Sequence, residues 1–302
     1  MRTRKEKATG REGGMPMPGA RAVVITGCSS GIGRAVAEHL ISRDYAVYAT
    51  ARRVDDLGDL AAAGAYVLRV DVADERSMRE CVRQVEDRHG AVWGLVNNAG
   101  YALTGPVEDI DMGEVRRQFE VNVFGQLTMA RLALPAMRSR GEGRIVNVSS
   151  VAGRFTFPGG GCYHASKHAL TSFSDALRFE VKPFGIYVST IEPGAVGTRF
   201  IDTALELLTR GAAAGEAPEY APFRRDLAHC YQRVRNAPRR YGVGPPQKVA
   251  RAVEHALRAP VPRPRYPVGA VAHVSLGLRR LLPQTLFDTL VRSYLPVPRR
   301  EG

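Results

Sequence analysis

Short apolar runs alternate with longer amphipathic segments from residue 20 onward. The runs predict β-strands at 22–26, 46–50, 66–70, 92–97, 144–149, 186–191 and 265–269. They are almost entirely apolar, which is typical of parallel strands covered on both faces. Between them, apolar residues recur at helical spacing, as in Val115, Phe119, Val123, Leu127, Ala130, Leu134 and Met137 and again in Leu170, Leu177 and Val181. The pattern therefore predicts an α/β fold with a doubly wound, seven-stranded parallel sheet and helices on both faces.

Three segments depart from this alternation. Residues 1–19 are rich in glycine and charge and are predicted to be a disordered basic tail. Residues 199–250 contain helical stretches rich in Pro, Ala and Arg, which indicates an insertion that forms a small helical lid. Residues 271–302 are predicted to form an amphipathic, basic helical extension at the C-terminus. The rest of the chain is predicted to form one main domain, 20–270, in which 199–250 is the lid insertion.

The composition favours a soluble globular protein. The chain has 302 residues, is 44% hydrophobic and contains no apolar run long enough to span a membrane. Its N-terminus lacks the apolar segment of a secretory signal, so we expect a cytoplasmic protein. The cysteines Cys28, Cys81, Cys162 and Cys230 form no C-x-x-C pair, which indicates free thiols and no metal site.

The net charge of +13 is concentrated at the two ends of the chain. Residues 1–21 have six basic against two acidic side chains, and residues 258–302 have eight against two. A basic tail and a solvated C-terminal face explain this distribution more simply than an anionic partner does. Nucleic acid is an unlikely partner on this interpretation, and association with a membrane surface is possible but not favoured.

Glycines mark the passage from the first predicted strand to the first helix. The segment TGCSSGIG at 26–33 has Gly27, Gly31 and Gly33 where a strand hands over to a helix. Such a turn, with Ser29 and Ser30 as hydroxyl donors or helix caps, places free N–H groups and the helix dipole where a phosphate can bind. An ordinary glycine-rich turn is the alternative.

A second group of residues suggests proton transfer. In YHASK, Tyr163 and Lys167 lie four residues apart and therefore on one face of a predicted helix. A nearby ammonium group lowers the pKa of a phenol toward neutrality. Ser150 follows the strand RIVNVSS at the carboxyl edge of the sheet, and Asn122 lies on the apolar side of the helix that begins near 112. Asn122 either serves the site or caps a neighbouring carbonyl.

These motifs together resemble the compact branch of the short-chain dehydrogenase/reductase family. The family pattern T-G-x-x-x-G-I-G, N-N-A-G and Y-x-x-x-K is matched by TGCSSGIG at 26–33, NNAG at 97–100 and YHASK at 163–167. The resemblance covers about residues 20–270. It implies a Rossmann-type fold that binds a nicotinamide dinucleotide and a catalytic tetrad of Asn122, Ser150, Tyr163 and Lys167.

The resemblance also implies the residues around the cofactor. Tyr163 and Lys167 would contact it as well, and the other positions are Gly27, Ser29, Ser30, Gly31, Ile32, Gly33, Arg52, Arg53, Asp71, Val72, Asn98, Ala99, Gly100, Pro193, Gly194, Val196 and Thr198. Asp71 would approach the adenine, Asn98 would lie beside the adenosine and brace the sheet, and Thr198 would meet the carboxamide.

The residues after the second predicted strand bear on the choice of cofactor. NAD-selective folds place an acidic residue there, and NADP-selective folds supply Arg for the 2′-phosphate. Ala51 takes the acidic position and Arg52 and Arg53 follow it, so NADP(H) is expected to be preferred, with NAD(H) possible.

The residues of the segments TGCSSGIG, YATARR and IEPGAVGTRF are similar to those of the hydroxysteroid and retinol dehydrogenase group. We therefore expect an oxidoreductase that interconverts an alcohol and its carbonyl on an apolar substrate such as a steroid, a retinoid or a lipid-like aldehyde or ketone. The alternatives are an NAD-dependent dehydrogenase of small alcohols and ketones and a non-catalytic dinucleotide sensor.

A pocket could be lined by Leu205, Leu207, Leu208, Phe223, Tyr231, Phe155 and Phe157. The family pairs subunits through the helices near 112–139 and 163–181, which implies a homodimer or homotetramer.

Overall fold

The computed structural model describes residues 21–211 and 217–298 and contains one seven-stranded parallel sheet in the order β3-β2-β1-β4-β5-β6-β7. The strands are β1 (Ala22–Ile25), β2 (Ala46–Ala51), β3 (Tyr66–Arg69), β4 (Gly94–Asn97), β5 (Gly143–Val148), β6 (Ile186–Pro193) and β7 (Arg265–Val268). Every predicted strand is present, with ends that differ by no more than two residues. The predicted doubly wound fold is confirmed.

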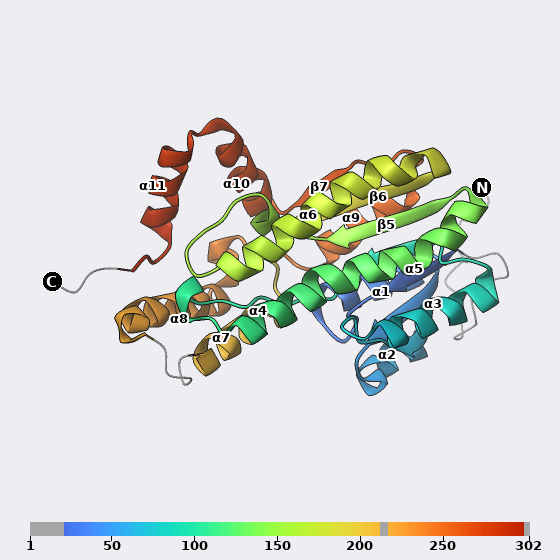
Figure 1. The fold of residues 1–302 in the computed structure, drawn as a ribbon, viewed down its shortest axis with the longest axis horizontal. Coiled ribbons are helices and arrows are strands. Elements are labelled where there is room, and N and C mark those ends of the chain that lie inside the picture. Colours follow the sequence, from blue (N-terminus) through green and yellow to red (C-terminus); the bar gives the residue numbers. More distant parts are fainter. Residues whose placement is uncertain (1–20, 212–216, 299–302) are drawn as a thin grey trace, which may run out of the picture.

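Helices cover both faces of the sheet (Figure 1). The helices of the main domain are α1 (Gly31–Ile41), α2 (Gly58–Ala62), α3 (Glu75–His89), α4 (Met112–Phe119), α5 (Gly125–Arg140), α6 (Gly161–Val181) and α9 (Gln247–Arg258). On one face, Val36 and Leu40 of α1 pack with Val253 and Leu257 of α9. The other face has a second apolar core, formed by side chains of α3, α5 and the end of α6. Because both faces are covered, β1 and β4 are buried along their whole length.

The predicted lid segment 199–250 consists mainly of two helices, α7 (Phe200–Gly211) and α8 (Ala221–Asn236). Their inward side chains include Leu208 and Leu227, which are buried. Residues 212–216 lie outside the described part of the chain. The end of the predicted segment belongs to the main domain instead, because α9 begins at Gln247 and buries Val249 and Ala250 in the first core.

The predicted C-terminal extension forms two helices, α10 (Ala270–Leu281) and α11 (Gln284–Tyr294), which we call the C-terminal hairpin. α10 follows β7 directly and lies next to it, whereas α11 lies farther from the sheet (Figure 1). The predicted tail, residues 1–19, lies outside the described residues. Among the residues described, no helix is long and apolar enough to cross a bilayer.

Candidate active site

The turn between β1 and α1 can be made only with glycine. Gly27 and Gly31 have φ angles of 74° and 62°, in the left-handed region that glycine tolerates. A Cβ at Gly33 would lie 2.2 Å from the carbonyl oxygen of Gly27, so a side chain there would collide with backbone. Ser30 occupies the N-cap position of α1, but its hydroxyl makes no capping hydrogen bond. The first turn of the helix therefore keeps N–H donors and a hydroxyl for an anionic ligand.

The end of β4 fixes this glycine turn from the side. The Thr26 hydroxyl oxygen accepts hydrogen bonds from the backbone N–H groups of Asn98 (2.9 Å) and Ala99 (3.0 Å). The Asn98 amide donates to the carbonyl oxygens of Thr26 (2.8 Å) and Gly27 (3.1 Å). Asn98 thus ties the end of β4 to the glycine turn, and Ala99 lies beside it.

The loop after β6 closes over the same turn. An ideal Cβ on Gly31 would lie 3.1 Å from both the Cβ and the Cγ2 of Thr198, so the two predicted cofactor loops are neighbours. Gly194 donates its N–H to the carbonyl of Val268 at the end of β7, and Val196 pairs with Gly244. Pro193 accepts a hydrogen bond of 3.4 Å from the Ser150 hydroxyl. The loop therefore connects the glycine turn to Ser150.

The residues that were expected on the adenosine side of a cofactor lie beyond β2 and β3. Arg52 and Arg53 directly follow the last residue of β2, Ala51, as expected. Arg53 forms an ion pair with Asp56 at 2.9 Å, whereas Arg52 is exposed and forms no ion pair within the described residues. After β3, Asp71 accepts a hydrogen bond from Ala73 and precedes the buried Val72. These groups lie at the carboxyl ends of adjacent strands, the edge at which open α/β sheets bind ligands.

The proposed catalytic residues meet where β5 ends and α6 begins. Ser150 caps the short helix Val151–Gly153 and forms a hydrogen bond with the Tyr163 hydroxyl. One turn further along α6, Lys167 is only 4% exposed and donates from Nζ to the carbonyl oxygen of Val148 at 2.9 Å. The ammonium group lies 6.0 Å from the centre of the Tyr163 ring. Ser150, Tyr163 and Lys167 thus form one cluster.

Asn122 reaches this cluster through a distortion of its helix. Residues Glu120–Phe124 form one π-helical turn between α4 and α5. The Asn122 side chain is fully buried, donates to the Tyr101 carbonyl (2.9 Å) and to the Ser166 hydroxyl (3.1 Å), and accepts from the Tyr101 N–H (3.0 Å). A Cβ on Gly100 would be 2.9 Å from Asn122 Oδ1 and 3.6 Å from Lys167 Nζ. The Asn122 amide thus caps the Tyr101 carbonyl, and its side chain lies on the same side of Gly100 as Lys167 Nζ.

Comparison with known proteins places this arrangement in a family. Residues 21–206 match the short chain dehydrogenase family. The chain belongs to this family. It is 36% identical to the uncharacterized oxidoreductase YbbO of Escherichia coli K12 over 273 residues, which are 90% of this chain and 94% of that protein. It is also 34% identical to human retinol dehydrogenase 5 over 299 residues, 93% of this chain and 91% of that protein.

Solved structures of the family agree with the fold. A short chain dehydrogenase/reductase from Burkholderia phymatum in complex with NAD superposes with a TM-score of 0.74, at 27% identity over 94% of this chain and 98% of that chain. Other similar structures contain NADP or an NADP derivative. As a short-chain dehydrogenase, the protein is an oxidoreductase that acts on CH–OH groups with NAD(P). The cradle formed by Gly27, Gly31 and Gly33 fits the pyrophosphate of such a cofactor.

In this short-chain dehydrogenase the electrostatics of Tyr163 differ from the expectation. Burial has the largest effect and raises the pKa of the Tyr163 hydroxyl to about 12, while the hydrogen bond with Ser150 lowers it. The expected lowering by Lys167 is not among these effects, because its ammonium group is turned to the Val148 carbonyl. Burial also lowers the pKa of Lys167, to about 8. The Tyr163 hydroxyl is therefore protonated at neutral pH.

Aromatic side chains from three segments lie around Tyr163 and the adjacent His164. The Phe200 ring of α7 meets the Tyr163 ring edge to face, 5.4 Å between centres. Tyr231 of α8 approaches Tyr163, and burial raises the pKa of its own hydroxyl. Phe157, in the loop before α6, packs on His164 at 4.2 Å. Of the predicted pocket residues, Leu205, Leu208 and Phe223 are buried, Leu207 is partly exposed, and Phe155 contacts the C-terminal hairpin.

The sequence analysis missed a buried carboxylate beside the site. Glu192, next to Pro193, is 1% exposed and accepts from Arg154 (3.1 Å) and Arg265 (2.7 Å). Arg265 also bonds Asp175 of α6. This network joins the loop after Ser150 to β6, β7 and α6. The sequence did contain a signal, because Glu192 is the single carboxylate within the apolar strand IYVSTIEP. A charge buried in such a strand requires partners of opposite charge.

His164, beside Tyr163, was also missed. Its ring is fully buried, and Nδ1 donates to the Phe155 carbonyl oxygen at 2.7 Å. Burial lowers the pKa of His164 to about 4, so the ring is neutral. His164 therefore holds the loop that carries Phe155 and Phe157 over the catalytic helix.

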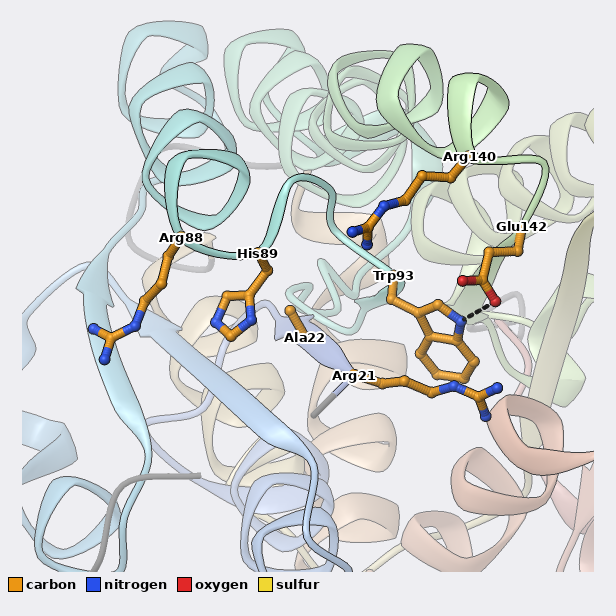
Figure 2. Close-up of a pocket in the computed structure, with 7 residues that line it drawn as sticks. All are labelled: Arg21, Ala22, Arg88, His89, Trp93, Arg140 and Glu142. Carbon is orange, nitrogen blue, oxygen red and sulfur yellow. Dashed lines mark hydrogen bonds between the residues drawn. The ribbon is translucent and has the colours of Figure 1, made fainter. Parts of the chain in front are cut away.

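A pocket of about 540 Å³ lies at the opposite, amino edge of the sheet (Figure 2). Its lining residues are Arg21, Ala22, Arg88, His89, Trp93, Arg140 and Glu142. Figure 2 shows Arg140 extending toward the space between His89 and Trp93, while Arg88 points away. Arg88 and His89 end α3 and Arg140 ends α5, where cations offset the helix dipoles. None of the proposed catalytic residues lines this pocket.

The lowered pKa of Lys167 predicts how stability depends on pH. An unfolded lysine keeps its proton until about pH 10.4, so unfolding takes up a proton between about pH 8 and 10. The contribution of Lys167 to the free energy of unfolding should therefore rise with pH across this window, and below pH 8 its full penalty remains. The buried thiols of Cys28 and Cys81, whose pKa values burial raises, contribute in the opposite direction, so the effect of Lys167 is the difference between the wild type and Lys167→Met. We expect Lys167→Met to be more stable than the wild type at pH 7 by about 2 kcal/mol, allowing for the lost bond to Val148. Urea unfolding without cofactor at pH 7 and pH 10 measures this.

The exposed Lys182 provides the control for this prediction. Lys182→Met should keep the pH dependence of the wild type. A free-energy difference between Lys167→Met and the wild type that stays the same from pH 8 to pH 10 would show that Lys167 is not the group that titrates.

Proposed function

We propose that the protein is an NADP(H)-dependent oxidoreductase that interconverts an apolar carbonyl compound, such as a retinoid, steroid or lipid-like aldehyde or ketone, and its alcohol. The observation that carries the proposal is the Tyr163 hydroxyl, which is bonded to Ser150 and lies beside two aromatic residues, Phe200 of α7 and Tyr231 of α8. It is a proton donor in an apolar surrounding. Human retinol dehydrogenase 5, by its name a dehydrogenase of retinol, supports this substrate class.

The nicotinamide cofactor would supply or accept the hydride at the substrate carbon. Ser150 would hold the substrate oxygen through its hydroxyl. Tyr163 would give its proton to that oxygen during reduction and take it back during oxidation. At neutral pH the high pKa of Tyr163 favours the protonated form, which is the form required for carbonyl reduction. Lys167 would bind the nicotinamide ribose, and Asn122 would position the cluster through its bonds to Tyr101 and Ser166.

An apolar cavity of about 450 Å³ supports the substrate class. It is lined by Pro106, Val107, Glu108, Pro158, Gly159, Tyr220, Phe223 and Pro298. Pro158 and Gly159 belong to the loop that precedes the catalytic helix, and Phe223 belongs to α8 of the lid. None of the proposed catalytic residues lines the cavity, so it would receive the end of an apolar substrate that is farthest from the oxygen held by Ser150.

Activity assays test this function directly. Purified protein with NADPH is given retinal, a ketosteroid, a long-chain aldehyde and a small ketone, and with NADP the corresponding alcohols. We expect kcat/KM to be higher for the three apolar carbonyls than for the small ketone. A preference for the small ketone would contradict the proposed substrate class, and no turnover with any of them would contradict the proposed function.

Cofactor preference provides a separate prediction. Arg52 follows Ala51 and is free to contact a 2′-phosphate, a charge-assisted contact that contributes about 1.5–3 kcal/mol, or roughly 10- to 150-fold in affinity. Arg52→Ala should therefore raise the Kd of NADPH by about tenfold or more and leave that of NADH nearly unchanged. Ala51→Asp should move the preference toward NADH. Fluorescence titration with each cofactor measures both effects.

Arg53 provides the matched control, because it is paired with Asp56. Arg53→Ala should affect NADPH less than Arg52→Ala does. An equal loss of NADPH and NADH affinity in Arg52→Ala would contradict the proposed role of Arg52.

We also propose a cytoplasmic homodimer or homotetramer, paired through the helices α4–α6. Large exposed apolar side chains gather on these helices: Met112, Phe124, Phe173 and Phe179. Patches of this kind mark interaction surfaces. Light scattering of the purified protein measures the mass, and a monomer would contradict this assembly.

A further inference from the structure

The C-terminal hairpin buries very little of its apolar surface. Among all residues of its two helices, only Ala272 in α10 and Phe287 in α11 are buried. Helices of eleven and twelve residues are only marginally stable in water without a packed apolar face. The hairpin therefore has two buried residues, several partly buried ones such as Leu276 and Leu278, and further apolar side chains that are exposed.

The exposed apolar side chains are large. Val274 is 60% exposed, Leu281 79%, Leu286 56% and Tyr294 78%. Single exposed apolar residues are common, but several of them on one short hairpin indicate an interaction surface.

The hairpin is also basic. Residues 270–298 contain Arg279, Arg280 and Arg292 against one acidic residue, Asp288, whose carboxylate accepts a hydrogen bond of 2.7 Å from Gln284. Arg279 lies over the Phe287 ring at 5.6 Å, while Arg280 and Arg292 are exposed. Leucine and tyrosine next to exposed arginines are the side chains that bind at the interface of an anionic bilayer.

We propose that the C-terminal hairpin docks on the surface of an anionic lipid bilayer. Leu281, Leu286 and Tyr294 enter the headgroup region, and Arg280 and Arg292 contact lipid phosphates. A second copy of the chain fits this surface less well, because pairing two hairpins would bring their arginines together. The sequence alone did not favour membrane association, and it is the exposed fractions of the leucines that change this conclusion.

The position of the hairpin gives the docking a consequence for catalysis. Phe287 packs edge to face on Phe155, 5.3 Å between ring centres, and Phe155 lies in the loop held by His164. Pro298, just beyond α11, lines the 450 Å³ apolar cavity with Phe223. Docking would thus place the cavity near the bilayer, from which an apolar substrate can enter. This consequence rests on the proposed function, whereas the docking itself does not.

Co-sedimentation with vesicles tests the docking without any activity assay. Wild-type protein is mixed with vesicles of phosphatidylcholine alone and with vesicles that contain one third phosphatidylglycerol. We expect the wild type to bind the anionic vesicles. Leu281→Gln/Leu286→Gln should bind them more weakly by about tenfold or more, since two leucine side chains no longer enter the lipid. Val261→Gln, at a site 73% exposed on another segment, should bind as the wild type does.

A second pair of variants tests the charges. Arg280→Gln/Arg292→Gln should bind anionic vesicles several-fold more weakly than the wild type does. Arg251→Gln/Arg258→Gln removes the same charge from α9 and should bind these vesicles more strongly than Arg280→Gln/Arg292→Gln does. The basic N-terminal tail is present in every variant, so these differences report on the hairpin. Circular dichroism confirms that each variant is folded.

Three results would overturn the proposal. One is the absence of wild-type binding to anionic vesicles, and another is equal binding by the wild type and Leu281→Gln/Leu286→Gln. The third is a smaller particle mass of Leu281→Gln/Leu286→Gln in lipid-free light scattering, which would assign the surface to a second copy of the chain.

Discussion

Tyr163→Phe should reduce turnover by about 10²- to 10⁴-fold, the contribution typical of general acid–base catalysis. The substitution removes only the hydroxyl, which is hydrogen-bonded with Ser150 and is protonated because burial raises its pKa to about 12. The ring keeps its contact with Phe200, so the fold and cofactor affinity should change little. Steady-state kinetics and cofactor titration measure the two properties separately.

Tyr231→Phe is the matched control for this prediction, because it removes a buried hydroxyl of the lid near the same place. It should change KM more than kcat. A kcat of Tyr163→Phe within a few-fold of the wild type would remove Tyr163 from the proton-transfer step.

Glu192→Ala should lower the free energy of unfolding by about 3 kcal/mol, the lower end of the effect of breaking a buried ion pair. The lower end applies because Arg154 and Arg265 are partly exposed, with side chains 39% and 27% accessible. Without the carboxylate, the two guanidinium groups repel each other next to Pro193. Thermal unfolding should show a Tm lower by about 6 °C or more, at roughly 2 °C per kcal/mol for a domain of this size.

Glu80→Ala is the control for Glu192→Ala, since Glu80 forms an exposed pair with Arg83 on α3. Exposed pairs contribute about 0–1 kcal/mol, so its Tm should stay close to that of the wild type. Equal Tm values for the two variants would show that the Glu192 network does not stabilise the fold.

The strands were predictable because each is a continuous apolar run between polar segments. β1 and β4 are buried along their length, and such strands leave a clear pattern. The glycine turn was predictable for a related reason, since the φ angles of Gly27 and Gly31 and the contact at Gly33 exclude other residues. Features of this kind depend on consecutive residues, so the sequence alone is enough to predict them.

Interactions between distant segments were not predictable. Glu192 and Arg265 are 73 positions apart, and no sequence pattern pairs them before the strand order is known. The direction of the Lys167 ammonium group also depends on where the Val148 carbonyl lies. The spacing of Tyr163 and Lys167 correctly placed them on one helix face, but the pKa of each group follows from its burial.

The π-helical turn at Glu120–Phe124 restricts the insertions and deletions that this helical segment can accept. A helix with one residue fewer there would return to regular α geometry, and the residues beside the deletion would face in a different direction around the helix. Asn122 would then turn away from Tyr101 and Ser166, although no catalytic side chain had been replaced. Insertions and deletions between Met112 and Arg140 should therefore be selected against in active relatives, while the loops at the helix ends can lengthen or shorten.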